Sequence, residues 1–122
     1  MVSDVSIEGD EKLIPELIFD SRGLMPAIVV DEEGQVLMLA WVDQEALRRM
    51  LRDGETWFYS RSRQEYWHKG ATSGNIQEVL SISVDCDADT LLIRVHQHGQ
   101  GACHTGTYSC FSRSLADRVG QA

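Results

Sequence analysis

The chain contains three cysteines, Cys86, Cys103 and Cys110, and each stands among polar or glycine residues rather than in an apolar run. Thiolates are good zinc ligands, and a catalytic zinc site commonly takes three protein ligands and keeps its fourth position for water or substrate. The alternative is that the three cysteines are inert and fill a core, as free cysteines often do. The polar surroundings favour a zinc site, although the spacing is not the Cys-x-x-Cys pair of a zinc finger.

Histidines near the cysteines could also take part in chemistry. His104 directly follows Cys103, and its imidazole could move a proton beside the metal or serve as a transient fourth ligand. The alternative, a histidine that only forms hydrogen bonds within a loop, stays open on the residues alone. His96 and His98 alternate along an expected strand, and we interpret them as exposed edge residues outside the site.

Three aspartates, Asp85, Asp87 and Asp89, surround Cys86 in the sequence. Their carboxylates repel one another unless a cation neutralises them, and hard oxygen ligands suit Mg²⁺ or Ca²⁺. An EF-hand is excluded, because Thr90 stands where that loop requires glycine. A solvated acidic turn is the alternative, but the adjacent cysteine favours a second metal site, for which magnesium is the expected ion.

A basic segment interrupts the otherwise acidic chain. Arg61, Arg63 and Lys69 lie close together, and Ser73 and Gly74 follow them. Guanidinium and ammonium groups bind phosphate, and hydroxyl and backbone N–H groups can add further donors. The alternative is a solvated loop whose positive charge offsets the surrounding acid. We predict that these five residues bind an anionic substrate.

The strands that must position these residues are predicted from hydrophobic alternation. The turn signal at residues 31–34 joins the first two strands into a hairpin, and a second hairpin carries the three aspartates at its turn. In the strand before that turn, Leu80, Ile82 and Val84 are expected to share one face. The expected strands cover residues 26–30, 35–42, 57–60, 77–84 and 90–98.

One main helix is expected over residues 44–52, with Asp43 as its N-cap and Gly54 as its stop. The predicted fold class is therefore α+β and strand-dominated, with antiparallel hairpins and one main helix. The segments without a strand or long-helix pattern are expected to be a functional loop at 61–75, a glycine-rich loop at 99–112 and a short terminal helix at 114–119.

The bulk composition describes an ordinary globular domain. The chain has 122 residues with 43% hydrophobic and 25% charged residues, so one domain is expected, with residues 1–14 as a polar lead-in. A net charge of −8 argues against nucleic acid or an anionic membrane as the main partner and favours a small-molecule substrate. The acidic N-terminus resembles no secretory signal, so we expect a cytoplasmic protein.

Four motifs, in this order along the chain, resemble phosphoribosyl-AMP cyclohydrolase, and the similarity runs from about Pro26 to Phe111. They are Ser60-Arg61-Ser62-Arg63, Trp67-His68-Lys69-Gly70 with Ser73-Gly74, Asp85-Cys86-Asp87-Ala88-Asp89, and Ala102-Cys103-His104-Thr105-Gly106 with Ser109-Cys110-Phe111. Together they are highly specific. One departure from the family pattern is Asp43, where the family usually has asparagine.

The resemblance implies a zinc-dependent hydrolase of histidine biosynthesis. Such an enzyme opens the adenine ring of phosphoribosyl-AMP between N1 and C6, the third step of the pathway, and gives phosphoribosylformimino-aminoimidazole carboxamide ribotide. A zinc-bound hydroxide would attack C6, with His104 beside the zinc. The resemblance also implies a homodimer with one zinc per subunit and active sites at the interface. The zinc ligands would be Cys86, Cys103 and Cys110, drawn from both chains, and the magnesium ligands Asp85, Asp87 and Asp89.

Two other classes of protein are less consistent with the residues. A zinc-dependent deaminase should carry His-x-Glu and Pro-Cys-x-x-Cys signatures, and neither occurs in the sequence. A structural zinc module that binds protein or nucleic acid would use four ligands, and for nucleic acid it would carry a positive net charge. The three thiols and the charge of −8 favour an enzyme.

Overall fold

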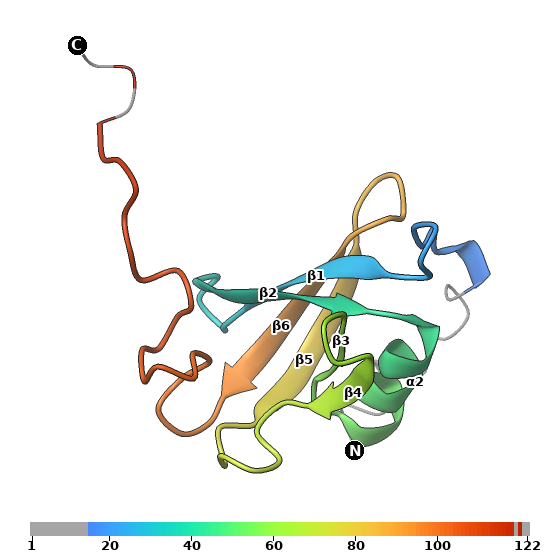
Figure 1. Cartoon of the computed structure of the whole chain (residues 1–122), viewed down its shortest axis with the longest axis horizontal. Coiled ribbons are helices and arrows are strands. Elements are labelled where there is room, and N and C mark those ends of the chain that lie inside the picture. Colours follow the sequence, from blue (N-terminus) through green and yellow to red (C-terminus); the bar gives the residue numbers. More distant parts are fainter. Residues whose placement is uncertain (1–14, 119, 121–122) are drawn as a thin grey trace.

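The computed structural model describes residues 15–118 and 120, and the expected lead-in at residues 1–14 lies outside them. Within this part, the strand-dominated α+β class is confirmed (Figure 1). No helix in the described part is long and apolar enough to span a membrane. The elements are β1 (Met25–Val30), β2 (Val36–Val42), α2 (Gln44–Asp53), β3 (Trp57–Ser60), β4 (Glu65–His68), β5 (Gln77–Val84) and β6 (Leu91–Gln97).

Two antiparallel hairpins combine into one four-stranded sheet with the order β2-β1-β6-β5. β1 pairs with β2, and β5 pairs with β6, both antiparallel as predicted. The hairpins meet through a parallel contact of β1 with β6, which local sequence patterns do not reveal. β3 and β4 form a separate two-stranded ribbon beside the sheet. β6 is therefore an inner strand over residues 91–94, where it pairs with both β1 and β5. Beyond Arg94 it pairs, among the described strands, with β5 alone, and there His96 is exposed as expected, whereas His98 is only partly exposed.

One face of the sheet packs on α2 and β3 and forms the core. Phe58 and Met50 are fully buried there, together with side chains from all four sheet strands. The helix starts at Asp43, whose Oδ1 accepts the N–H of Ala46 at 2.8 Å. It ends at Gly54, which adopts a left-handed conformation with φ of 73° that favours glycine. Both predicted boundaries are confirmed.

The opposite face of the sheet, which we call the outer face, carries an apolar row. Ile28 of β1 is paired with Leu39 of β2 on one side and with Leu92 of β6 on the other. Leu39 is 47% exposed and Leu92 is 43% exposed. Exposed apolar side chains that are contiguous across strands often mark a surface for association.

Three local expectations were wrong. Residues 61–75 were expected to be a loop, but they contain β4, whose short strand Glu65–His68 pairs with β3. In β5, a register shift between Val79 and Ser81 breaks the alternation, so that Val79 rather than Leu80 enters the core. The terminal helix is absent from residues 114–118. There the chain leaves the body, and Leu115 is fully exposed, so no tertiary packing offsets the cost of helix nucleation (Figure 1).

Candidate active site

Two segments that are distant in sequence meet along a cleft of about 360 Å³. The segment after β4 contributes Lys69 and Ser73, and the loop after β6 contributes Cys103 and His104. The sequence predicted a chemical role for each of these four residues, and the fold brings them to one place. His104 is exposed, so its imidazole is accessible from the cleft.

Lys69 is buried, which the sequence did not suggest. Its side chain is only 8% exposed, and its Nζ donates to the carbonyl oxygen of Ala102 at 2.5 Å. Burial lowers the pKa of Lys69, and the neighbouring Cys110 and Cys103 oppose that change. The ammonium group therefore joins the two walls of the cleft. Gly74 lies at the turn beyond it, where its N–H donates to the carbonyl oxygen of Gly70 at 2.9 Å.

Cys103 and Cys110 lie close together in the loop after β6. A hydrogen bond from Thr105, whose Oγ1 is 2.9 Å from the Cys103 Sγ, is the main cause that lowers the pKa of Cys103 to about 6. Thr107 and Cys110 lower it further. Burial raises the pKa of Cys110, and the neighbouring Cys103 raises it too. One of the two thiols is thus prepared to be a thiolate near neutral pH, the form that binds zinc.

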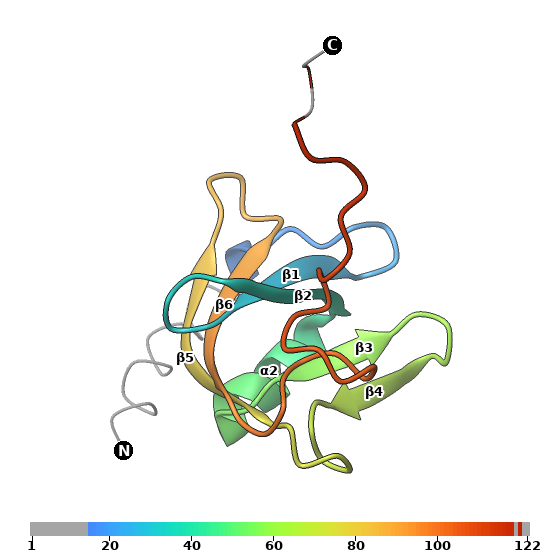
Figure 2. The same ribbon diagram turned by 90° about the vertical axis from the view of Figure 1, so that its left-hand side faces the viewer.

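Cys86 lies at the other end of the sheet. It belongs to the turn between β5 and β6, whereas Cys103 follows the end of β6 (Figures 1 and 2). The seven residues of β6 span about 20 Å at the rise of a strand. Cys110 is held at the far end too, because its N–H donates to the carbonyl oxygen of Leu37 at 2.7 Å. Within one chain, Cys86 therefore cannot share an ion with the other two cysteines.

Asp85, Asp87 and Asp89 do come together, at the turn beside Cys86. One carboxylate oxygen from each lies within 4.8 Å of the others. Burial opposes ionisation of Asp85, but hydrogen bonds, including those from the N–H groups of Asp89 and Thr90, hold its pKa below the usual value. The neighbouring Asp89 and Asp85 raise the pKa of Asp87. Three exposed carboxylates at this distance offer the oxygen ligands that Mg²⁺ prefers.

Arg61 and Arg63 face two different clefts on either side of Trp67. Arg61 lines a cleft of about 630 Å³, where its guanidinium lies 4.5 Å from the centre of the Trp41 ring. Arg63 lines a cleft of about 520 Å³, and its Nη1 lies 3.8 Å from Glu65. The predicted basic residues are therefore distributed over neighbouring clefts rather than gathered around one anion.

Asp43, the departure from the family pattern, has both carboxylate oxygens engaged. Oδ1 caps α2 through the N–H of Ala46, and Oδ2 accepts the hydroxyl of Tyr66 at 2.6 Å. Burial, followed by this hydrogen bond, raises the pKa of Tyr66 to about 12. In this chain Asp43 joins the helix start to β4, which is a structural role.

The sequence did not single out Gln77 and Gln97, two glutamines whose buried side chains lie behind the cleft. Gln77 is fully buried, and Gln97 is 9% exposed. A signal for Gln97 was present, because it continues the alternation of Leu91, Ile93 and Val95, the inward residues of β6. A polar residue at an inward position usually has specific hydrogen-bond partners.

A small α+β domain with an open cleft, in which a thiol, an imidazole and a buried lysine converge, has the features of an enzyme that acts on a small molecule. The sequence model of the phosphoribosyl-AMP cyclohydrolase family matches residues 38–112. The chain belongs to this family. The matched region includes every candidate site residue.

Similar proteins of two kinds agree with this assignment. The chain is 55% identical to the phosphoribosyl-AMP cyclohydrolase of Chloroherpeton thalassium, over 87% of this chain and 76% of that protein. It is 59% identical to that of Lactiplantibacillus plantarum, over 73% of this chain and 82% of that protein. It is also 59% identical to the histidine biosynthesis bifunctional protein HisIE of a Nostoc species, over 80% of this chain and 46% of that protein. The match thus spans about half the length of this bifunctional relative.

Proposed function

We propose that this chain catalyses the hydrolytic opening of the adenine ring of phosphoribosyl-AMP in histidine biosynthesis. The observation that carries the proposal is that Lys69, Ser73, Cys103 and His104 line one cleft, although they come from two distant segments of the region matched to the family. The relatives with this name cover most of the chain at 54–59% identity.

The proposed reaction consumes one water. Its oxygen forms a bond to C6 of the purine, the C6–N1 bond breaks, and N1 leaves with a proton. His104 is exposed in the cleft, and imidazole both accepts and donates protons near neutral pH. In this proposal His104 accepts a proton as the C–O bond forms and returns a proton to N1 as the ring opens. Arg61, Arg63, Lys69, Ser73 and Gly74 bind and orient the substrate.

Cys103 and Cys110 fit a zinc ion, because they are neighbouring thiols and one of them has a pKa of about 6. When bound, zinc would supply a water of lowered pKa as the nucleophile. Cys86 would complete the ligand set only from a second copy of the chain, since it lies about one sheet length away in its own subunit. The homodimer with shared active sites is therefore part of the proposal.

The outer face is the surface that suits such a dimer. Its apolar row of Ile28, Leu39 and Leu92 crosses β1, β2 and β6. The β5–β6 turn, which contains Cys86, and the loop after β6, which contains Cys103, lie at opposite ends of the sheet (Figure 2). Two copies could pack outer face to outer face, with a two-fold axis that lies between the sheets and runs along this row, across the strands. This axis reverses the strand direction, so each Cys86 would approach the partner's loop after β6. The aspartate cluster would move with Cys86, so its proposed magnesium would lie beside the same active site.

The direct test is turnover of phosphoribosyl-AMP by the purified chain. Ring opening is followed by ultraviolet absorbance, before and after treatment with a zinc chelator and after zinc is restored. We expect chelator-sensitive turnover that returns with zinc, and loss of both zinc and turnover in Cys110→Ser. Ser114→Ala, on the exposed tail, is the matched control and should behave as the unmodified chain. Turnover that survives complete removal of zinc would contradict the proposed chemistry.

A further inference from the structure

A buried relay of polar side chains lies behind the candidate active site. Gln77 begins β5 and Gln97 ends β6, and the two residues are paired across the hairpin. The Nε2 of Gln77 donates to the Oε1 of Gln97 at 2.9 Å. The hydroxyl of Thr56, which is fully buried, donates to the Oε1 of Gln77 at 2.9 Å. We call Thr56, Gln77 and Gln97 the relay. Because the Thr56 hydroxyl binds the Oε1 of Gln77, the Nε2 of Gln77 must face the Oε1 of Gln97, and the Nε2 of Gln97 is turned to the other side.

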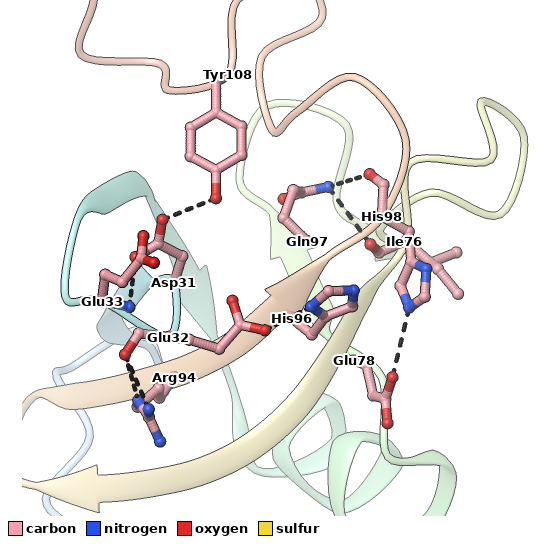
Figure 3. A network of polar contacts seen from close by, with 10 residues as sticks. All are labelled: Asp31, Glu32, Glu33, Ile76, Glu78, Arg94, His96, Gln97, His98 and Tyr108. Atoms are coloured by element: carbon pink, nitrogen blue, oxygen red, sulfur yellow. Dashed lines mark hydrogen bonds and ion pairs between the residues drawn. The ribbon is translucent and has the colours of Figure 1, made fainter.

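The amide nitrogen of Gln97 faces three backbone carbonyl oxygens. It lies 3.1 Å from that of Asn75, 3.4 Å from that of Ile76 and 2.9 Å from that of His98. Figure 3 shows the last two of these contacts, with the Gln97 side chain between the two chain segments. Asn75 and Ile76 follow directly on the segment of Ser73, whereas His98 opens the loop that leads to Cys103. One amide group thus binds both walls of the cleft.

The two walls meet again just beyond this amide. The side-chain Oδ1 of Asn75 accepts the N–H of Gln100 at 3.1 Å, and both residues line the cleft. The approach is so close that a Cβ on Gly99 would clash with the same Oδ1. The walls are therefore in direct contact at Gly99, where no larger residue fits. The hydrogen bonds of Asn75, Lys69 and Gln97 hold them together.

We propose that Gln97 is a positioning residue of the candidate active site. Its amide holds the segment of Ser73 and the loop of Cys103 and His104 in one fixed relation, and Gln77 and Thr56 orient that amide. The consequence for turnover rests on the proposed ring-opening function, while the consequence for the order of the loop does not. No other side-chain type supplies two N–H donors and one acceptor in this shape except asparagine, which is one methylene shorter.

Two substitutions separate the donor function from packing. Gln97→Glu keeps the shape, but its ionised carboxylate would face three carbonyl oxygens, so burial and repulsion raise the pKa of the introduced carboxyl. When protonated, that carboxyl regains one donor, and the relay is partly restored as the pH falls. Gln97→Met keeps the length, has no donor and does not titrate. Gln44→Glu makes the same chemical change at an exposed position at the start of α2 and is the matched control.

The first measurement is the pH profile of kcat/KM with phosphoribosyl-AMP. At pH 8 we expect both Gln97 variants to fall at least about tenfold below the unmodified chain, mainly in kcat. At pH 6 the Gln97→Glu deficit should shrink to about threefold while the Gln97→Met deficit stays. Equal deficits of the two variants at both pH values would mean that Gln97 only packs, and would overturn the proposal. Gln44→Glu should match the unmodified chain throughout.

The second measurement is hydrogen exchange of backbone amides, which needs no turnover. The N–H groups of Gln100, Ala102 and Cys103 are hydrogen-bonded across or within the loop. We expect their exchange in Gln97→Met to be at least about tenfold faster, with no change in α2. Unchanged exchange in a folded variant would overturn the positioning role. If the unmodified chain lacks turnover, the proposed function fails, and the exchange result alone decides the role of Gln97.

Discussion

The separation of the cysteines within one chain makes a quantitative prediction for mixed dimers. A site built from Cys103 and Cys110 of one copy and Cys86 of the other is destroyed in both Cys86→Ser and Cys103→Ser homodimers. In a heterodimer of these two variants, one site takes Cys103 and Cys110 from the Cys86→Ser subunit and Cys86 from the Cys103→Ser subunit, so it is intact. The other site lacks both Cys103 and Cys86. When subunits are mixed equally and at random, half of the dimers are heterodimers. The mixture should therefore recover about a quarter of the wild-type sites.

The assay is turnover of phosphoribosyl-AMP and bound zinc, measured after the two variants are refolded together. Cys103→Ser with Cys110→Ser is the control mixture. Because these two cysteines lie in the same loop, no heterodimer of that pair contains an intact site, and recovery should be nil. Failure of the first mixture to recover, although a tag on each variant shows that heterodimers form, would refute shared sites. Recovery in the control mixture would refute the grouping of Cys103 with Cys110.

Three further predictions follow from single contacts. Asp43→Ala should lower the free energy of unfolding by about 2 kcal/mol, because it removes the cap of α2 and leaves the Tyr66 hydroxyl without its acceptor. Asp43→Asn should lower it by less than about half of that, and chemical denaturation measures both changes. The hydrogen bond from Tyr108 to Asp31, 2.7 Å long, lowers the pKa of Asp31, so its stabilisation is present above the unfolded pKa and is lost as pH falls through the folded pKa. Tyr108→Phe should therefore cost about 1–2 kcal/mol at pH 7 and flatten the loss of stability in acid; an unchanged acid profile would disprove the link. Arg61→Ala should raise KM several-fold at constant zinc content, and an unchanged KM would remove Arg61 from the substrate site.

Local patterns were sufficient for most of the elements. Alternation predicted β5 at its true bounds and β6 to within one residue at each end. Capping chemistry at Asp43 and Gly54 predicted the limits of α2. The hairpin turn with three aspartates was predicted for the same reason, because turn residues are recognised over short distances. These features depend on residues that are neighbours in the sequence.

Predictions failed where a distant contact decides the local structure. β4 forms because β3 lies beside it; Tyr66 and Trp67 favour a strand, but its four residues stand in a polar, glycine-rich segment and are too few to predict one. The segment 114–118 has an adequate helix composition but no surface on which to pack. The burial of Lys69 was not predicted, because only the approach of the loop after β6 shows that its Nζ binds the carbonyl oxygen of Ala102. Its role in substrate binding stays a prediction.

The sequence by itself determined which groups are available and which family the chain belongs to, because three thiols, three aspartates and a basic segment are fixed by residue type and order. The tertiary structure alone decided how the thiols are divided. The hairpin of β5 and β6 carries Cys86 to one end of the sheet, and the return of the chain carries Cys103 and Cys110 to the other. Strand length sets that distance, since a β-strand cannot fold back on itself. The same topology places Gln97 behind the cleft, where a residue that looked like part of the core holds two loops together.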